Sequence, residues 1–244
     1  MHIVRLSLLL LILLAGLGIA HTQQGMTATG DYLTWNYNDA DDSGFSLGTI
    51  VGRFFTPQLI QDVQQIRRYI RHEKFAILMR RDGDLRAVDA IYQKALAIAD
   101  YNIVRALFLS MMGVLDHQNL EIRIPVLGKV GVPLTYETDS LYSARINHLP
   151  AKLYPDSPET SQSDKDKLQH FFGSAYLAYT TDSPELARAS GNFIEWGETQ
   201  FIVGGVNDIR DRRANKQGEQ FGHDLSVIKN LLPSEYIHVS TRIP

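Results

Sequence analysis

The residues of this sequence whose types suit chemistry gather between residues 163 and 222. His170, Glu195 and Asp211 combine an imidazole with two carboxylates, and we expect these three side chains to carry any catalysis. Imidazole and carboxylate groups bind zinc, manganese or iron, and a bound cation lowers the pKa of a water nucleophile. A further carboxylate is close by in the sequence, so the predicted ligands of a divalent metal are His170, Glu195, Glu198 and Asp211.

The same residues have a second interpretation as a buried structural network. In this network His170 bonds to Glu195 or Asp211, and Asn215 caps or bridges helices. Networks of this kind fix the register of packed helices when every member is satisfied. In a metal centre, Asn215 would instead orient a ligand or donate to an oxyanion. Both interpretations place the same supporting residues around the centre: Asp166, Lys167, Ser174, Asn215, Gly218 and Gly222. The sequence alone leaves open which interpretation holds and whether the protein is an enzyme.

Three predicted helices position these residues. The first follows an N-cap at Ser163 and carries His170. The second begins with Ser-Pro-Glu at residues 183–185, a capping serine before a proline at the first helical position, and it carries both glutamates. The third begins near Asn207 or Asp208. On this third helix four residues share one face because they lie at i, i+4, i+7 and i+11: Asp211, Asn215, Gly218 and Gly222. Each interior glycine destabilises a helix by about 1 kcal/mol relative to alanine, so the face indicates a close helix–helix approach beside a polar site.

Two sequence patterns in this region carry a resemblance to a known family. Residues 166–171 read Asp-Lys-x-x-His-Phe, and residues 211–222 read Asp-x-x-Ala-Asn-x-x-Gly-x-x-x-Gly. With Glu195 and Glu198 between them, these patterns resemble the VanZ-like families and related small uncharacterised periplasmic lipoproteins. The resemblance covers about residues 164–225, and it implies a shared helical scaffold with a His/Glu/Asp/Asn polar centre. It implies no particular reaction.

The chain departs from these families in ways that bear on membrane attachment. VanZ-like proteins are membrane-embedded, whereas arginine and lysine side chains crowd the matching helices here, which predicts a soluble or peripheral version. The serine that commonly lies three positions before the third-helix aspartate is Asp208 in this chain. The sequence has no cysteine, so it lacks the lipidation site of the lipoproteins. A basic cluster could still contact anionic lipid head groups, at about 1 kcal/mol per charge near a membrane, through Arg210, Arg212, Arg213 and Lys216.

Composition excludes several further classes of function. The absence of cysteine excludes thiolate zinc sites, iron–sulfur clusters, disulfide scaffolds and a cysteine nucleophile. With 24 basic and 27 acidic residues, the charge balance gives no electrostatic case for a nucleic-acid partner. The sequence also has no His-Glu-x-x-His, no Gly-x-Ser-x-Gly, no phosphate-binding glycine loop and no dinucleotide fingerprint.

Residues 1–20 have the pattern of an export signal. Arg5 supplies a positive charge, Leu6–Leu14 is an apolar run, and Gly18 and Ala20 precede a plausible cleavage site. The apolar stretch is about fifteen residues, shorter than the roughly 20 that span a bilayer comfortably. We therefore expect secretion across the inner membrane to the periplasm, with an uncleaved N-terminal anchor as the less favoured alternative.

The rest of the chain predicts a mostly α fold with a bundle-like helical body. Turn residues at Arg80–Asp84 break a first helix that follows Thr56-Pro57, and an apolar stripe then runs from Leu85 through Asn102 to Arg105. Alternating residues predict a small β-hairpin at about 120–137. The expected organisation is a signal peptide at 1–20, an N-terminal segment with a short β element at 21–55, a helical region at 56–118, the hairpin and a linker at 119–163, a three-helix VanZ-like region at 164–232 and a tail at 233–244.

Two functions follow as hypotheses from different classes. One is an exported bacterial cell-envelope protein whose polar centre acts mainly as a structural or accessory site. The other is a metal-assisted hydrolase or transferase acting on a lipid-linked or phosphorylated envelope substrate. They differ in whether His170 and the carboxylates converge on an accessible pocket.

Overall fold

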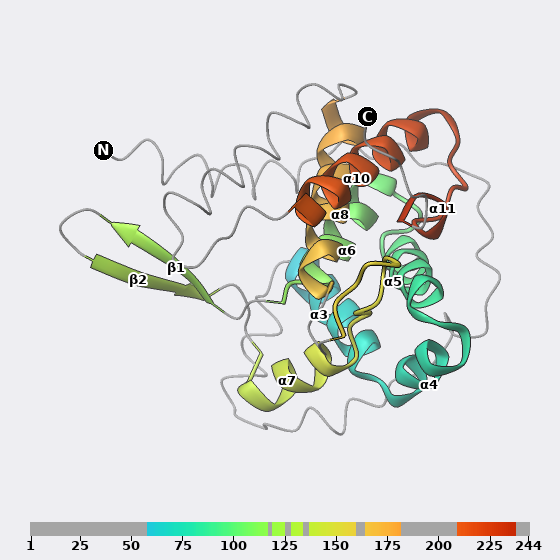
Figure 1. Cartoon of the computed structure of the whole chain (residues 1–244). Coiled ribbons are helices and arrows are strands. Elements are labelled where there is room, and N and C mark those ends of the chain that lie inside the picture. The colour runs from blue at the N-terminus through green and yellow to red at the C-terminus, as the bar shows by residue number, and fades with distance from the viewer. Residues whose placement is uncertain are drawn as a thin grey trace.

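A computed structural model describes residues 58–116, 119–124, 128–133, 137–159, 164–181 and 209–237. Most of these residues lie in helices, which confirms the mostly α fold (Figure 1). In chain order the elements are α3 (Gln58–Arg71), α4 (Glu73–Asp82), α5 (Asp84–Ile98), α6 (Ile103–Gly113), β1 (Asn119–Ile124), β2 (Gly128–Pro133), α7 (Asp139–Asn147), α8 (Lys165–Thr181), α10 (Ile209–Val227) and α11 (Ser234–Ile237).

The first helical stretch has more breaks than its apolar periodicity indicates. The expected break falls at Gly83, which has a φ of +89° and separates α4 from α5. A further break, not expected, falls at His72, whose Nδ1 accepts a hydrogen bond from the Lys74 N–H at 3.1 Å and so caps α4. Histidine is outside the usual set of N-cap residues, so the sequence carries no strong signal for a helix start here.

A second unexpected break interrupts the stripe that begins at Leu85. Helix α5 ends at Ile98, and the next residues include Asp100 and Tyr101 with φ of +50° and +61°. Asn102 was expected to continue the stripe, but its side-chain oxygen accepts from the Arg105 N–H at 3.0 Å and starts α6. Asn102 fits the helical spacing of the stripe, but asparagine is favoured at the N-cap, and here it starts a new helix instead of continuing α5.

The core joins these N-terminal helices to α8 and α10. Phe171 of α8 stacks on Phe221 of α10 with ring centroids 5.4 Å apart, and Tyr92 of α5 meets Phe221 edge-on at 5.5 Å. Phe108 of α6 contacts Tyr176 of α8 in the same way at 5.9 Å. One hydrophobic cluster therefore runs through all four helices, and Figure 1 shows α8 and α10 crossing over α6 beside α5.

The stretch between α6 and α8 contains more structure than a hairpin and a linker. Strands β1 and β2 pair antiparallel from Asn119↔Pro133 to Ile124↔Gly128, where the sequence predicts a hairpin. In Figure 1 they project away from the helices. Helix α7 lies in the stretch interpreted as hairpin and linker, and it begins at an N-cap, Thr138, whose hydroxyl accepts from the Leu141 N–H at 3.4 Å.

Several predicted features lie outside the described residues. They are the export signal at 1–20, the N-terminal β element at 21–55 and the helix that carries Glu195 and Glu198. In the part of the chain that the structure describes, no helix is long and apolar enough to cross a membrane.

Candidate functional site

Helices α8 and α10 bring six of the predicted site residues together. We call this group the polar centre; it consists of Asp166, Lys167, His170 and Ser174 on α8 and Asp211 and Asn215 on α10. Lys167, His170 and Ser174 on α8, and Asp211 and Asn215 on α10, recur at spacings of three or four, so each set lies on one helix face, with Asp166 next to Lys167. The packing of the two helices therefore turns two sequence patterns into one cluster.

Lys167 lies at the middle of the polar centre. Its ammonium is 2.5 Å from Asp166 Oδ2 and 2.5 Å from Asp211 Oδ1, and its side chain is only 3% exposed. Burial by itself would lower the pKa of Lys167, but the two carboxylates outweigh burial and raise that pKa above its ordinary value. Lys167 therefore stays charged in the folded protein and neutralises part of two acidic side chains.

The two aspartates differ in how far they are buried. Asp211 is 8% exposed and Asp166 is 36% exposed at the side chain. Burial raises the pKa of Asp166, and the hydrogen bond from Lys167 opposes that rise. The sequence presents Lys167 only as a supporting residue, whereas the structure makes it the bridge between the two helices.

His170 belongs to a hydrogen-bonded chain with Asn215 and Ser174. Its Nδ1 lies 3.2 Å from Asn215 Oδ1, and the Ser174 hydroxyl donates to the same oxygen at 3.0 Å. Because an amide oxygen only accepts, this arrangement places the hydrogen of His170 on Nδ1. His170 Nε2 is 3.7 Å from Asp211 Oδ1, which is too long for a hydrogen bond.

Gly218 and Gly222 allow the two helices to approach this closely. A Cβ atom at Gly218 would lie 2.0 Å from the carbonyl oxygen of Phe171, and one at Gly222 would lie 2.2 Å from that of Ala175. Both clashes are with helix backbone, which has no room to give way. The glycines therefore set the distance at which Asp211 and Asn215 meet α8.

The structure places only two of the four predicted metal ligands. Glu195 and Glu198 lie outside the described residues, while His170 and Asp211 are neighbours in the polar centre. Among the residues that the structure places, no three histidine or carboxylate side chains lie together as a metal site would need. Asp211 Oδ1, the oxygen nearest His170, is already held by the Lys167 ammonium.

A second set of polar contacts, which sequence reasoning missed, holds the N-terminal end of α8. Asp164 is fully buried and accepts hydrogen bonds from the Leu153 N–H at 3.1 Å, from Arg210 at 2.8 Å and from the Ser157 hydroxyl. The Tyr154 hydroxyl also donates to Gln217 on α10 at 2.9 Å. In the sequence, the only feature that marks Asp164 is its place beside the predicted N-cap of α8. Its partners come from the linker and from α10, so this place does not reveal them.

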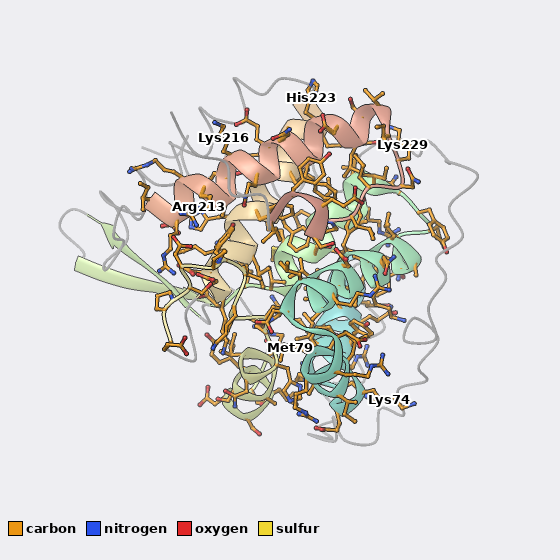
Figure 2. The ribbon with its side chains drawn as sticks, turned by 45° about the vertical axis from the view of Figure 1, so that its right-hand side comes forward. Lys74, Met79, Arg213, Lys216, His223 and Lys229 are labelled. Atoms are coloured by element: carbon orange, nitrogen blue, oxygen red, sulfur yellow. The ribbon has the colours of Figure 1, made fainter. Side chains whose placement is uncertain are left out.

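The basic cluster on α10 is partly used inside the protein. Arg210 pairs with Asp164, and Arg213 forms two bonds of 2.6 and 2.9 Å to Asp156 while lying over the Tyr154 ring. Arg212 and Lys216 are exposed, and Figure 2 shows Lys216 on the outer side of α10. Two of the four predicted lipid-contacting residues are therefore engaged in ion pairs.

Comparisons with known proteins give no match from which a function could be assigned. No family model matches the chain, nor does any curated protein or any solved structure. The function is therefore inferred from the geometry of the polar centre and from the sequence patterns around it.

Proposed function

We propose that this is an exported cell-envelope protein in which the polar centre is a structural site that locks α8 to α10. The observation that carries the proposal is the Lys167 ammonium between Asp166 and Asp211. The leucine-rich segment at 1–20 and the VanZ-like patterns at about 164–225 support the assignment to the envelope. In this role the protein acts as an accessory or scaffold component.

The charge on Lys167 favours the structural role over a metal centre. A divalent cation bound to Asp211 Oδ1 would lie roughly 4–5 Å from an ammonium held at 2.5 Å on the same atom. At an effective dielectric constant of about 20, the repulsion between them is on the order of 7 kcal/mol. The negative charge of Asp211 is already compensated by the Lys167 ammonium, and a metal ion would have to displace that ammonium.

Metal content and stability together test this role. We expect purified wild-type protein and the His170→Ala variant to hold the same amount of metal by elemental analysis. We expect Lys167→Met to lower the free energy of unfolding by about 3–5 kcal/mol, because it leaves two carboxylates without their cation. Lys152→Met is the matched control, since Lys152 forms an exposed pair with Glu159, and its effect should stay below about 0.5 kcal/mol.

One result would reverse the assignment. Stoichiometric metal in the wild type that is lost in His170→Ala would establish a metal centre and restore the metal-assisted hydrolase or transferase as the function. A loss of stability in Lys167→Met no larger than that in Lys152→Met would remove the structural role.

Export is tested on the mature protein. Fractionation of the producing bacterium should place the protein in the periplasm, and N-terminal sequencing should find His21 as the first residue. Recovery of the intact N-terminus in the membrane fraction would show an anchor instead.

Contact with anionic lipid is part of the same proposal and is carried by the exposed cations. Sedimentation with vesicles that contain anionic lipid should recover less Lys216→Ala than wild-type protein at low salt, and about 0.15 M salt should weaken the binding of both. Equal recovery of the two proteins would remove Lys216 from such a surface.

A further inference from the structure

A hollow of about 220 Å³ lies between α7 and the beginning of α8. One face of α7 lines it with residues spaced i, i+1, i+4 and i+5, and the other walls come from Asp116, which follows α6, and from the first residue of α8. The lining residues are Asp116, Tyr142, Ser143, Ile146, Asn147 and Lys165. The hollow is smaller than the roughly 300–1,000 Å³ of drug-sized pockets, so it suits a small polar molecule.

Lys165 is the most unusual residue of this wall. It is only 5% exposed, yet within the described ranges its ammonium has neither a hydrogen bond nor an ion pair. Burial lowers the pKa of Lys165, and the negative charges of Asp116 and Asp84 act against that effect. A buried cation without a direct partner destabilises the folded chain, whereas a methionine would fill similar space without a charge.

The position of Lys165 in the fold places a helix terminus beside the hollow. It is the first residue of α8, a helix of 17 residues, and the N-terminus of a helix carries a partial positive charge. Ser143 and Asn147 on the facing side of α7 offer a hydroxyl and an amide as hydrogen-bonding groups. The lining therefore combines a cation at a helix terminus with neutral polar groups and one carboxylate.

We propose that this hollow binds a small molecule with a single carboxylate, which pairs with the Lys165 ammonium. Ser143 and Asn147 hydrogen-bond to the polar remainder of the ligand. Asp116 lines the same hollow and limits the charge of the ligand, because its carboxylate repels a doubly charged phosphate more strongly than a monoanion. Lys165 and Lys167 lie two residues apart and so point to different sides of α8, although Asp116 of the hollow lies near enough to Asp166 of the polar centre to help raise its pKa.

Thermal unfolding in different anions tests the site with acetate as the probe. We expect sodium acetate to raise the unfolding midpoint of the wild type by a few degrees and in a saturable way, compared with sodium chloride at equal ionic strength. The Lys152→Met control should show the same rise. Lys165→Met should fold, because it removes a buried charge, and it should show no rise with acetate.

Mapping of lysine reactivity locates the effect. Trinitrobenzenesulfonate should modify Lys165 more slowly in acetate than in chloride, with no change at Lys152, as read by peptide mass spectrometry. An equal acetate rise in wild type and Lys165→Met would overturn the site, as would no rise in either protein. A larger rise with phosphate than with acetate would overturn the choice of a carboxylate. These outcomes are independent of metal content, so they are distinguishable from a failure of the structural role of Lys167.

Discussion

Lys165 and Lys167 show how strongly the environment decides the role of one residue type. Both are buried, and burial alone lowers the pKa of each. Two carboxylates within 2.5 Å raise the pKa of Lys167, whereas Lys165 has only longer-range attraction from acidic residues. Lys167 therefore contributes to holding helices together, and Lys165 keeps a charge that a ligand can neutralise.

Asp89 should make stability depend on pH in a defined direction. Burial raises its pKa, although Ser234 donates from its N–H at 2.9 Å and its hydroxyl at 2.8 Å and so opposes the rise. Because the raised pKa means that the folded state binds the proton more tightly than the unfolded state, protonation of Asp89 stabilises the folded state. This contribution to the free energy of unfolding is fully present below the ordinary aspartate pKa. It is lost as pH rises through the raised pKa.

The Asp89→Asn variant tests this dependence. Its amide can accept from the Ser234 N–H and donate to the hydroxyl, so stability relative to wild type should increase between acid and neutral pH in urea unfolding. Asp89→Ala is the contrasting variant and should lose about 1–3 kcal/mol, because it removes the carboxylate that accepts from the Ser234 N–H and hydroxyl. A difference between Asp89→Asn and wild type that is constant with pH would contradict the raised pKa.

Asp100 stores backbone strain that a glycine should relieve. It follows the end of α5 with a φ of +50°, and left-handed conformations disfavour residues with a Cβ by roughly 1–2 kcal/mol, somewhat less for aspartate. Asp100→Gly should therefore raise the free energy of unfolding by about 0.5–1 kcal/mol. Asp100→Ala removes the same carboxylate but keeps the Cβ, so urea unfolding of the two variants separates strain from charge. Equal stability of the two variants would rule out strain as the cause.

At the scale of elements, the contact between α8 and α10 depends on glycine. Alanine normally stabilises a helix interior by about 1 kcal/mol over glycine, but a Cβ at Gly218 would lie 2.0 Å from the Phe171 carbonyl oxygen. Gly218→Ala must separate the helices or distort them, so we expect a loss of at least about 3 kcal/mol.

Gly173→Ala is the matched control on the partner helix. The nearest atom to a Cβ there is Met111 Sδ at 3.4 Å, part of a flexible side chain. Gly173→Ala should therefore be neutral or gain up to about 1 kcal/mol in chemical unfolding. A similar effect of both substitutions would show that Gly218 is not a contact point.

The parts of the fold that the sequence predicts are those with local signals. Apolar spacing indicates the buried positions Val63, Ile66 and Ile70, and Gly83 marks a helix break because it tolerates a positive φ. On α10 the spacing of Asp211, Asn215 and the two glycines identifies the face that meets α8. In each case one element holds the whole pattern.

The features that the sequence does not predict depend on contacts between distant residues. The role of Lys167 requires Asp211 from a helix far along the chain, and α7 has no clear apolar stripe to mark it. Asp164 resembles an ordinary cap residue until the linker folds over it and Leu153 donates to it. Spacing in one segment carries no information on such partners.

At the scale of the whole molecule, a buried ion network joins the early helices to α7. Arg145 of α7 donates to the carbonyls of Gly113 and Leu115 at the end of α6, at 3.1 and 2.6 Å, and to Glu137 at 2.9 Å. Glu137 also accepts from Arg71 of α3 at 2.7 Å. Together with the aromatic core, this network leaves no helix from α3 to α10 packed by itself among the described residues, which argues for one cooperative unit.

Native-state hydrogen exchange tests that cooperativity. The amides of α5, α6, α8 and α10 should approach one common free energy of opening as urea is added. Tyr92, Phe172 and Phe221 form one cluster across α5, α8 and α10, and Phe108 joins α6 to α8 through Tyr176. Phe172→Leu should lower that value by about 1–2 kcal/mol in all four helices. Arg80→Ala, at an exposed pair on α4, should leave it unchanged. If Phe172→Leu lowered protection in α8 and α10 alone, the pair would be a separate folding unit, and the polar centre would then hold together a subdomain and not the molecule.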